Sequence, residues 1–364
     1  MRICLSMIVR DEAAVIRRCL QSVRPFIDSW AISDTGSMDG TQDLIRRELA
    51  DLPGELIERP WVNFAHNRNE ALQLAARHGD YALVIDADEM LVAEAGFSWP
   101  ILDAPGYQFE FHFGNTRYRR IAMPRLDADW CWRGVLHEAL VSPKAAETKC
   151  LSGLHVLVQS DGARSQRPAA EKFAADAAIL RQALIDEPDN ARYVFYLAQS
   201  LRDSGQLGDA LATYRRRVAM GGWEEEVYQS MLQVALLSER CGCTDAEILA
   251  AFLHAYDYRP SRAEAPCELA RYCRLQKRYA LGRDFAAVAM AKAPTDDVLF
   301  VDHGVLAWRA RDELAVSSYW CGEYSVCAEH CRQLLANASL PDSERQRVEA
   351  NLTFALAGLE NLVQ

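Results

Sequence analysis

The sequence lacks the signatures of several common enzyme classes. It contains no GxxxxGK[ST] loop, no GxGxxG turn after a strand, no HExxH pair and no GxSxG elbow. These absences argue against a P-loop ATPase, a Rossmann-type dehydrogenase, a zincin protease and an α/β-hydrolase. Any catalytic chemistry must therefore rest on another arrangement of side chains.

Long apolar runs and paired CxxC motifs are also missing. The opening segment, MRICLSMIVRDE, is a short apolar run with charge at both ends, which predicts neither a signal peptide nor a membrane span. The eleven cysteines are scattered, so we expect reduced, mostly buried thiols and a cytoplasmic protein. The net charge of -11 argues against a nucleic acid as partner.

A length of 364 residues suffices for two domains, and the two halves follow different patterns. The first half alternates short apolar runs with amphipathic segments. Strands are expected at 3–9, 29–33, 55–59 and 81–85, and helices at 11–25, 41–50 and 65–79. This alternation predicts parallel βαβ units in a doubly wound sheet, with a β-rich segment from about 100 to 160.

Acidic residues follow two of these strands. The stretch LVIDADEM (83–90) ends an apolar strand on Asp86, Asp88 and Glu89, and Asp34 ends another. In an extended segment Asp86 and Asp88 point the same way and can reach one hard cation, while Glu89 points away. A solvated turn is the alternative interpretation. In doubly wound sheets, ligands bind beyond the carboxyl ends of the strands, where these acids fall.

The second half is nearly all helical and repetitive. Ala198, Ala235, Ala270 and Ala315 recur with spacings of 37, 35 and 45 residues, and small or apolar residues follow at common offsets. This pattern predicts a degenerate tetratricopeptide-like solenoid, whose ideal period is about 34 residues. A generic helical bundle is the alternative. We place the domains at 1–165 and 166–364.

Several segments together resemble the family 2 glycosyltransferases, which have the GT-A fold. They are CLSMIVRDEAAVIRRCLQSV, SDTGSMDGTQDLI, FAHNRNEAL and LVIDADEM, in the order and at the separations usual for that family. With the helical repeats included, the plan is similar to that of bacterial peptide S-glycosyltransferases of the sublancin type. The resemblance implies an α/β GT-A domain with a Rossmann-like mixed sheet, followed by an all-α tetratricopeptide-like solenoid.

The resemblance also implies site residues. Asp34 would bind the nucleobase or ribose, and Arg68 would reach the base or the phosphates. Asp86 and Asp88 would form the metal-binding DxD motif. The remaining positions expected to line the nucleotide pocket are Ser6, Val9 and Glu12. For Asp34, Arg68 and Glu12, a capping or surface role is the alternative.

The segment DWCWRGVLHEAL (129–140) holds two tryptophans, an arginine and a His-Glu pair. By resemblance, an acidic residue in such a loop deprotonates the acceptor, and we expect Glu138 to do so. His137 is the alternative base, or a contact to the metal or the diphosphate. His155 is a candidate third metal ligand, with a packed strand histidine as the alternative.

The implied activity is a metal-dependent, inverting, non-processive transfer of one sugar by a hexosyltransferase. The donor is a nucleotide sugar, with UDP-sugar expected, and the metal is Mn²⁺ or Mg²⁺. The acceptor would be a peptide, a protein or a glycan held partly by the repeats, which are also a candidate homodimer surface. The alternatives are a non-catalytic interaction scaffold with a degenerate GT-A domain, and a nucleotidyltransferase. The processive-synthase signature QxxRW is absent.

Overall fold

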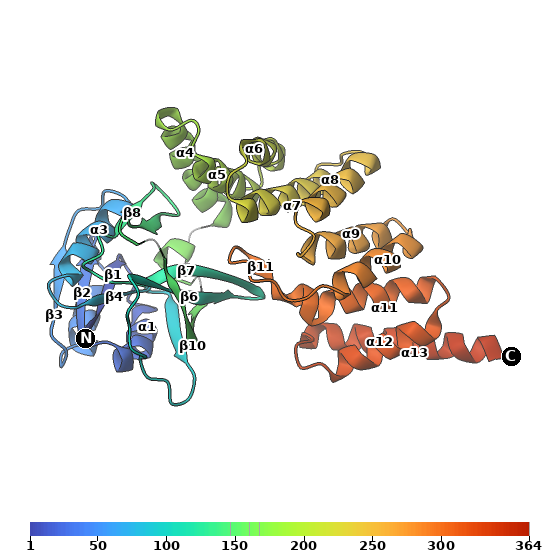
Figure 1. Cartoon of the computed structure of the whole chain (residues 1–364), viewed down its shortest axis with the longest axis horizontal. Coiled ribbons are helices and arrows are strands. Elements are labelled where there is room, and N and C mark those ends of the chain that lie inside the picture. The colour runs from blue at the N-terminus through green and yellow to red at the C-terminus, as the bar shows by residue number, and fades with distance from the viewer. Residues whose placement is uncertain (146, 160, 167, 364) are drawn as a thin grey trace. The chain divides into compact units, whose positions relative to one another are not determined.

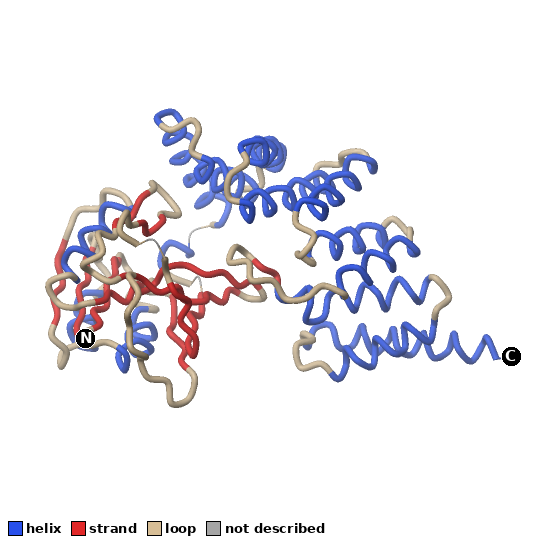
Figure 2. The backbone as a smooth tube through the Cα atoms, in the orientation of Figure 1, coloured by secondary structure: helices blue, strands red, loops and turns tan. Residues whose placement is uncertain are grey.

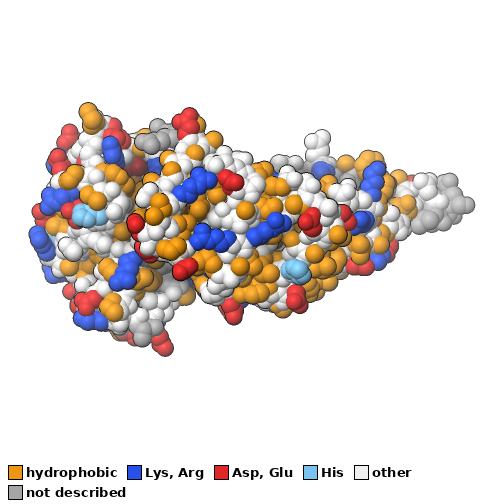
Figure 3. All heavy atoms as spheres, turned by 90° about the horizontal axis from the view of Figure 1, so that it is seen from above, with side chains coloured by type: hydrophobic (Ala, Val, Ile, Leu, Met, Phe, Trp, Pro, Cys, Tyr) orange, Lys and Arg blue, Asp and Glu red, His pale blue; other side chains and the backbone are white. Residues whose placement is uncertain are grey.

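The computed structural model describes residues 1–145, 147–159, 161–166 and 168–363, and the chain divides into two compact units, Met1–Gln206 and Leu207–Gln364. Strands gather in the first unit and helices dominate the second (Figures 1 and 2). Charges of both signs are interspersed with apolar side chains on the face seen in Figure 3.

The first sheet has four parallel strands in the order β3-β2-β1-β4, as the alternating pattern predicts. Their bounds are β1 (Ile3–Val9), β2 (Ser29–Asp34), β3 (Gly54–Glu58) and β4 (Tyr81–Val84). Val9 pairs with Asp34 at the carboxyl end of the central strands. β1, β2 and β4 are buried almost throughout, because helices cover both faces of the sheet.

Side chains alternate across β1. Its odd-numbered residues join the apolar core with α1 (Ile16–Val23) and α2 (Thr41–Glu48), whereas Cys4 joins a second core with α3 (Phe64–Ala75). The doubly wound arrangement is therefore confirmed. α1 begins later than the expected residue 11, because Asp11 adopts a left-handed conformation and the 11–13 backbone bonds to residues 37–41. The short helix η1 (Arg24–Phe26) follows α1.

A second, antiparallel-and-parallel sheet completes the α/β part of this unit. Within the unit its strands lie in the order β7-β6-β10-β5. Their bounds are β5 (Glu89–Ala93), β6 (Gly106–Phe113), β7 (Thr116–Pro124) and β10 (Lys149–Val158). A separate hairpin, β8 (Cys131–Arg133) with β9 (Ala139–Val141), packs against α3.

Helices follow after the short helix η2 (Ala163–Gln166). α4 (Ala169–Asp186) and α5 (Ala191–Asp203) pack on each other within the first unit. The predicted domain boundary at 165/166 falls where strands give way to helices, while the compact unit runs on to Gln206.

The repeat that the alanines predict is visible in the ends of four helices. All four alanines are fully buried, and each helix ends on a left-handed residue seven positions later: Gly205, Gly242, Lys277 and Gly322. In every case the carbonyl three positions after the alanine accepts the N–H five positions further on, at 2.8 or 2.9 Å. This is the Schellman ending, so one turn geometry is reused at each anchor.

In the second unit, each helix packs on the next along the chain. The helices are α6 (Leu207–Met220), α7 (Glu224–Arg240), α8 (Asp245–Tyr258), α9 (Glu264–Leu275), α10 (Tyr279–Met290), α11 (Ala310–Trp320), α12 (Tyr324–Ala336) and α13 (Asp342–Val363). The long 45-residue spacing contains an insertion with β11 (Val301–Asp302) and η3 (Val305–Arg309) before α11.

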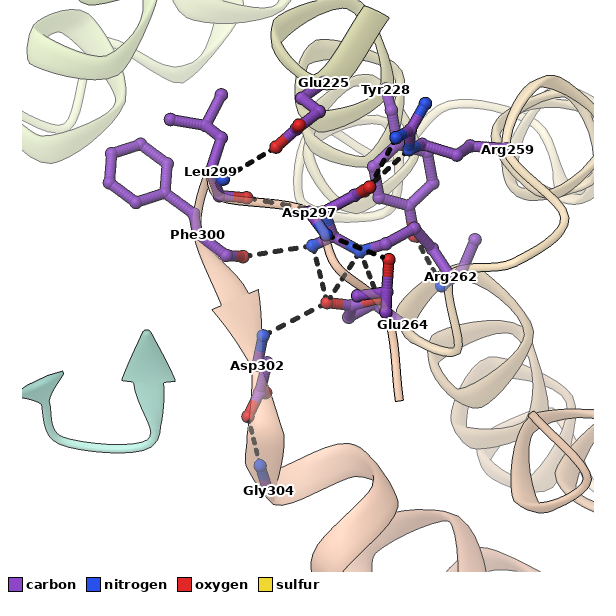
Figure 4. A network of polar contacts seen from close by, with 12 residues as sticks. Glu225, Tyr228, Arg259, Arg262, Glu264, Asp297, Leu299, Phe300, Asp302 and Gly304 are labelled. Atoms are coloured by element: carbon purple, nitrogen blue, oxygen red, sulfur yellow. Dashed lines mark hydrogen bonds and ion pairs between the residues drawn. The ribbon is translucent and has the colours of Figure 1, made fainter. Parts of the chain in front are cut away.

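A buried arginine network ties this insertion to the helices (Figure 4). The Arg262 side chain is 1% exposed and donates to Glu264 at 2.6 Å, to Asp297 at 3.0 Å and to the carbonyls of Leu299 and Phe300. Arg259 donates to Asp297 as well. Burial raises the pKa of Asp297, but the hydrogen bonds from Arg259 and Arg262 outweigh it and lower that pKa overall.

We expect Asp297→Ala to destabilise the second unit by about 3 kcal/mol, because it leaves Arg262 buried with only part of its partners. Hydrogen exchange of α9 amides in the full chain would report the loss. The exposed neighbour Asp296 provides the matched control, and Asp296→Ala should cost less than about 0.5 kcal/mol. Equal exchange in the two variants would contradict the expectation.

Candidate active site

The carboxyl edge of the first sheet carries three loops, 10–15, 35–40 and 85–88, that follow β1, β2 and β4. Hydrogen bonds join the first two loops. Ser37 accepts the Asp11 N–H, Thr41 accepts the Glu12 N–H, and Asp39 accepts the Ala13 N–H. The chain therefore folds its strand-end acids into one connected edge, which is where doubly wound folds bind ligands.

Asp34 is fully buried at this edge. Its Oδ1 accepts hydrogen bonds from the N–H groups of Gly36 and Ser37, both at 2.9 Å, and from the Gln42 amide at 3.2 Å. Its Oδ2 is buried and has no hydrogen-bond partner in the described part of the chain. A buried carboxylate oxygen without a partner is costly, which makes Oδ2 a candidate acceptor for a ligand hydroxyl or N–H.

Glu12 and Asp88 converge on the backbone of residues 162–163. The Gly162 N–H lies 3.4 Å from an Asp88 oxygen, and the Ala163 N–H lies 3.2 Å from a Glu12 oxygen. A Cβ on Gly162 would lie 2.9 Å from the Glu12 oxygen and 3.2 Å from the Asp88 oxygen, so the two carboxylates share one small space.

Burial and mutual repulsion oppose the charged forms of these two carboxylates. Burial, together with the nearby Asp88 and Asp86 charges, raises the pKa of Glu12 to about 7 despite the hydrogen bond from the Ala163 N–H. Burial and the Asp86 charge also raise the pKa of Asp88. Carboxylate oxygens are the ligands that Mg²⁺ and Mn²⁺ prefer. Among the described residues, however, no group of three or more His, Cys, Asp or Glu side chains forms a metal site by itself.

Asp86 has a different environment from Asp88. Arg68 donates to its Oδ1 at 2.6 Å, and Arg120 lies 3.6 Å from its Oδ2. Burial raises the pKa of Asp86, but the two guanidinium groups lower it below the ordinary value. Asp86 is therefore neutralised by two arginines, whereas Asp88 forms no ion pair within the described residues and accepts the Gly162 N–H.

Glu89 fixes the turn that carries both aspartates. It is 3% exposed, accepts the Asp86 N–H at 2.9 Å, and accepts Arg120 with both oxygens at 2.9 Å. Burial, with the Asp86 charge, raises its pKa to about 7 despite Arg120. The sequence did not single out Arg120, because three arginines crowd its strand and nothing in the pattern distinguishes this one.

Arg68 and Asn69 of α3 bring the β8–β9 hairpin to the same site. Asn69 bonds the Trp132 backbone twice, at 2.8 and 3.0 Å, and Arg68 lies 5.1 Å from the Trp132 ring centroid. Arg68 Nε then donates to Glu138 Oε1 at 2.5 Å. Glu138 is thereby joined through one guanidinium to Asp86. Trp132 itself is buried beneath this contact and packs with the α3 core, while Trp130 bonds the Pro105 carbonyl.

His137 turns away from Glu138 and packs on α5. Its ring stacks on Tyr196 with centroids 4.0 Å apart, and its carbonyl accepts two hydrogen bonds from Arg192. The residue keeps an exposed surface, yet desolvation of the crowded imidazole and the cations Arg164, Arg192 and Lys172 lower its pKa to about 3.

Of three further expected site residues, Val9 lies at this edge opposite Asp34, while Ser6 and His155 lie away from it. Ser6 is buried in β1, three positions before the strand ends, and the Val9 carbonyl is taken by the Thr35 N–H and hydroxyl. His155 stacks on His112 at 4.1 Å. The N–H of Gln159 donates to the Asp88 carbonyl. His155 lies four positions before Gln159, and four residues of a strand span about 13 Å. The structure does not bring His155 to the aspartates.

A parallel sheet with carboxylates at its ligand edge, followed by helical repeats, agrees with a GT-A domain and a tetratricopeptide-like solenoid. Residues 4–94 match the model of the family "Glycosyl transferase family 2". This N-terminal part of the chain is therefore similar to family 2 glycosyltransferase domains. The predicted fold class, an α/β GT-A domain followed by an all-α solenoid of tetratricopeptide-like repeats, is confirmed.

Two curated proteins are similar in sequence. A TPR repeat-containing protein of Synechococcus elongatus is 28% identical over 270 residues, covering 68% of this chain and 64% of that protein. An uncharacterized glycosyltransferase of Rickettsia felis is 31% identical over 93 residues, covering 26% of this chain and 31% of that protein. The chain thus spans less than two thirds of the length of both relatives.

Among solved structures, a thermophilic TPR protein of Thermus thermophilus has a TM-score of 0.37 and 16% identity, covering 51% of this chain and 93% of that one. A tetratricopeptide repeat protein of Parabacteroides merdae has a TM-score of 0.39 and 16% identity, covering 53% and 73%. Within the described residues, no helix combines the length and the apolar character that crossing a membrane requires.

We expect Arg68→Met to destabilise the first unit by about 3 kcal/mol, because it leaves Asp86 and Glu138 without the cation they share. Calorimetry of the full chain would measure the change. Arg77→Met is the matched control, since Arg77 is exposed just beyond the same helix.

The double variant Arg68→Met/Glu138→Gln should regain part of the loss, as coupled partners do. If Arg68→Met and Arg77→Met melted alike, the shared guanidinium would not hold the site together.

Proposed function

We propose that this protein is a metal-dependent glycosyltransferase that moves one sugar from a nucleotide-sugar donor, with UDP-sugar as the expected donor, to an acceptor. The observation that carries the proposal is the edge itself. In the described part of the chain, one buried carboxylate there has an oxygen without a hydrogen-bond partner, and two further carboxylates share a small space and form no ion pair. Both features suit a nucleotide. Its nucleoside can donate hydrogen bonds to the buried oxygen, and its negatively charged phosphates can bind a metal ion together with the two carboxylates.

Asp34 is the proposed anchor of the nucleoside. Its Oδ1 is fixed by three donors, which leaves Oδ2 oriented for a base N–H or a ribose hydroxyl. A carboxylate that accepts from a ribose hydroxyl is a recurrent device at such sheet edges. The backbone of the 11–13 loop, joined to residues 37–41, would form the adjacent wall.

Asp88 and Glu12 are the proposed protein ligands of the metal, with Asp86 keeping the turn in place through Arg68. Mg²⁺ commonly binds through one or two carboxylates and the phosphates of its substrate, which fits a site that holds two carboxylates and no complete metal cluster of its own. A bound Mn²⁺ or Mg²⁺ would neutralise the charge that develops on the diphosphate leaving group.

Glu138 is the proposed base. Arg68 engages its Oε1, and in the described part of the chain its Oε2 makes no hydrogen bond, so this oxygen can accept a proton from an acceptor hydroxyl or thiol. His137 is disfavoured, since a pKa of about 3 makes its imidazole a poor base and its ring packs on Tyr196. A single base acting in line with the leaving group corresponds to inversion at the anomeric carbon.

The acceptor is proposed to be a peptide, a protein or a glycan, bound in part by the repeats, which form concave surfaces in this class of solenoid. Non-processive transfer agrees with the missing QxxRW signature. The cytoplasm is the proposed compartment, because the cysteines are free thiols. A homodimer through the repeats remains part of the proposal.

We expect UDP to bind the full chain in the presence of Mn²⁺ and to bind much more weakly in EDTA. Asp88→Asn and Glu12→Gln should each weaken Mn²⁺-dependent UDP binding by at least about tenfold, because each removes a carboxylate from the cation. Titration calorimetry measures both. Asp43→Asn is the control, since that side chain is 90% exposed on α2.

Release of UDP from UDP-glucose and UDP-N-acetylglucosamine would then test catalysis. A folded protein that bound neither UDP nor these donors with Mn²⁺ would favour the non-catalytic scaffold instead. UDP binding without dependence on Mn²⁺ or on Asp88 would refute the metal-dependent mechanism.

A further inference from the structure

The turn that precedes Glu138 has an unusual backbone. Residues 134–138 join β8 to β9, and this turn contains two positive φ angles: 119° at Gly134 and 51° at His137. Glycine adopts such a conformation freely, but histidine does so against a steric cost. A non-glycine residue held in this region beside a site residue requires contacts that hold it there.

Those contacts come from α5. Arg192 donates to the His137 carbonyl through Nε at 3.0 Å and Nη2 at 2.8 Å. The Tyr196 ring, one helical turn later, stacks on the His137 ring at an interplanar angle of 7°. The Arg192 guanidinium lies 4.9 Å from the centroid of that same tyrosine ring. The Tyr193 hydroxyl is also within hydrogen-bonding reach of the Val135 backbone.

The turn is thus held from two sides. Arg68 of α3 holds the Glu138 carboxylate, and α5 holds the backbone and ring of the residue just before it. Gly134 closes the turn from within, because a Cβ there would lie 3.3 Å from the Glu138 Cα. If α5 released His137, the strained residue would be free to relax, and a change in its φ would swing Glu138 away from Arg68.

We propose that Arg192 is a positioning residue for Glu138 and that α5, a helix of the repeat pattern, is part of the catalytic unit. Arg192 acts through the His137 carbonyl. This inference rests on the proposed role of Glu138 as base. Its structural half, the fixing of the 134–138 turn by α5, does not depend on that role.

Hydrogen exchange on the full chain tests the structural half without any substrate. In Arg192→Ala, amides of the 134–139 segment should exchange about tenfold faster, because two hydrogen bonds to this turn are lost. Amides of β1 and α3 should exchange as in the parent protein. Arg192→Lys keeps a cation and one donor and should give an intermediate rate. Arg202→Ala, on the same helix, is the control, since that guanidinium bonds Asp203.

The ring contact has its own pair of variants. Tyr196→Phe keeps the aromatic face and should leave the exchange of this segment unchanged, whereas Tyr196→Ala should accelerate it. Unchanged exchange in both Arg192→Ala and Tyr196→Ala would overturn the proposal.

Kinetics test the catalytic half. With UDP-N-acetylglucosamine or UDP-glucose and Mn²⁺, Arg192→Ala should lower kcat for UDP release by about ten- to a hundredfold with little change in KM or in UDP affinity. A rise in KM at constant kcat, or an unaltered kcat beside faster exchange, would overturn the role in positioning Glu138. If the parent protein released no UDP from any donor, the proposed function would fail, and the exchange data would still decide whether α5 fixes the turn.

Discussion

The Arg68 guanidinium is the interaction on which the site depends. It is buried, and it bonds two carboxylates that lie 18 and 70 residues away along the chain, Asp86 at a strand end and Glu138 on a hairpin. Water cannot replace such a contact, because removing one partner strands the other charges in a poorly solvated space. The position of the hairpin relative to the sheet is therefore set by electrostatics as well as by the apolar packing of Trp132 on α3.

The charges at the edge divide into two groups. Asp86, Glu89 and Glu138 are balanced by Arg68 and Arg120, and they build the turn and the hairpin. Glu12 and Asp88 accept hydrogen bonds from backbone N–H groups, and burial raises the pKa of both side chains. Each carboxylate of the first group contacts an arginine of the protein, although Glu138 uses only one of its oxygens to do so. The carboxylates of the second group form no ion pair within the described residues. Such a division is typical of functional sites. The protein neutralises one set of charges with its own side chains, and the other set is left to interact with the substrate.

Much of this was predictable from the sequence. The parallel strands with helices between them followed from the apolar alternation. The place of Asp34 at the end of a strand followed as well, but the strand order and the complete burial of Asp34 did not. The sequence also predicted that Asp86 and Asp88 point the same way and bind one cation, but in the structure the two side chains have different partners. The period-two rule applies to strands, but β4 ends at Val84, and residues 86–89 form a turn closed by the Glu89 N–H on the Asp86 carbonyl. Arg120 and α5 reach the site from distant segments, which no local pattern reveals.

The helical repeats also show that a local sequence pattern does not reveal contacts between distant segments. The alanine spacing predicted the repeats. It marks the same place in four helices, because each buried alanine is followed seven positions later by a left-handed residue that ends the helix. The spacing of the alanines could not reveal that the first of these helices, α5, also contacts the turn between β8 and β9. On α5, Ala198 is a repeat anchor, while Arg192 and Tyr196 contact His137 in the turn between β8 and β9. A helix has several faces, so one sequence period can specify its place in a solenoid while other positions commit it to a neighbouring domain.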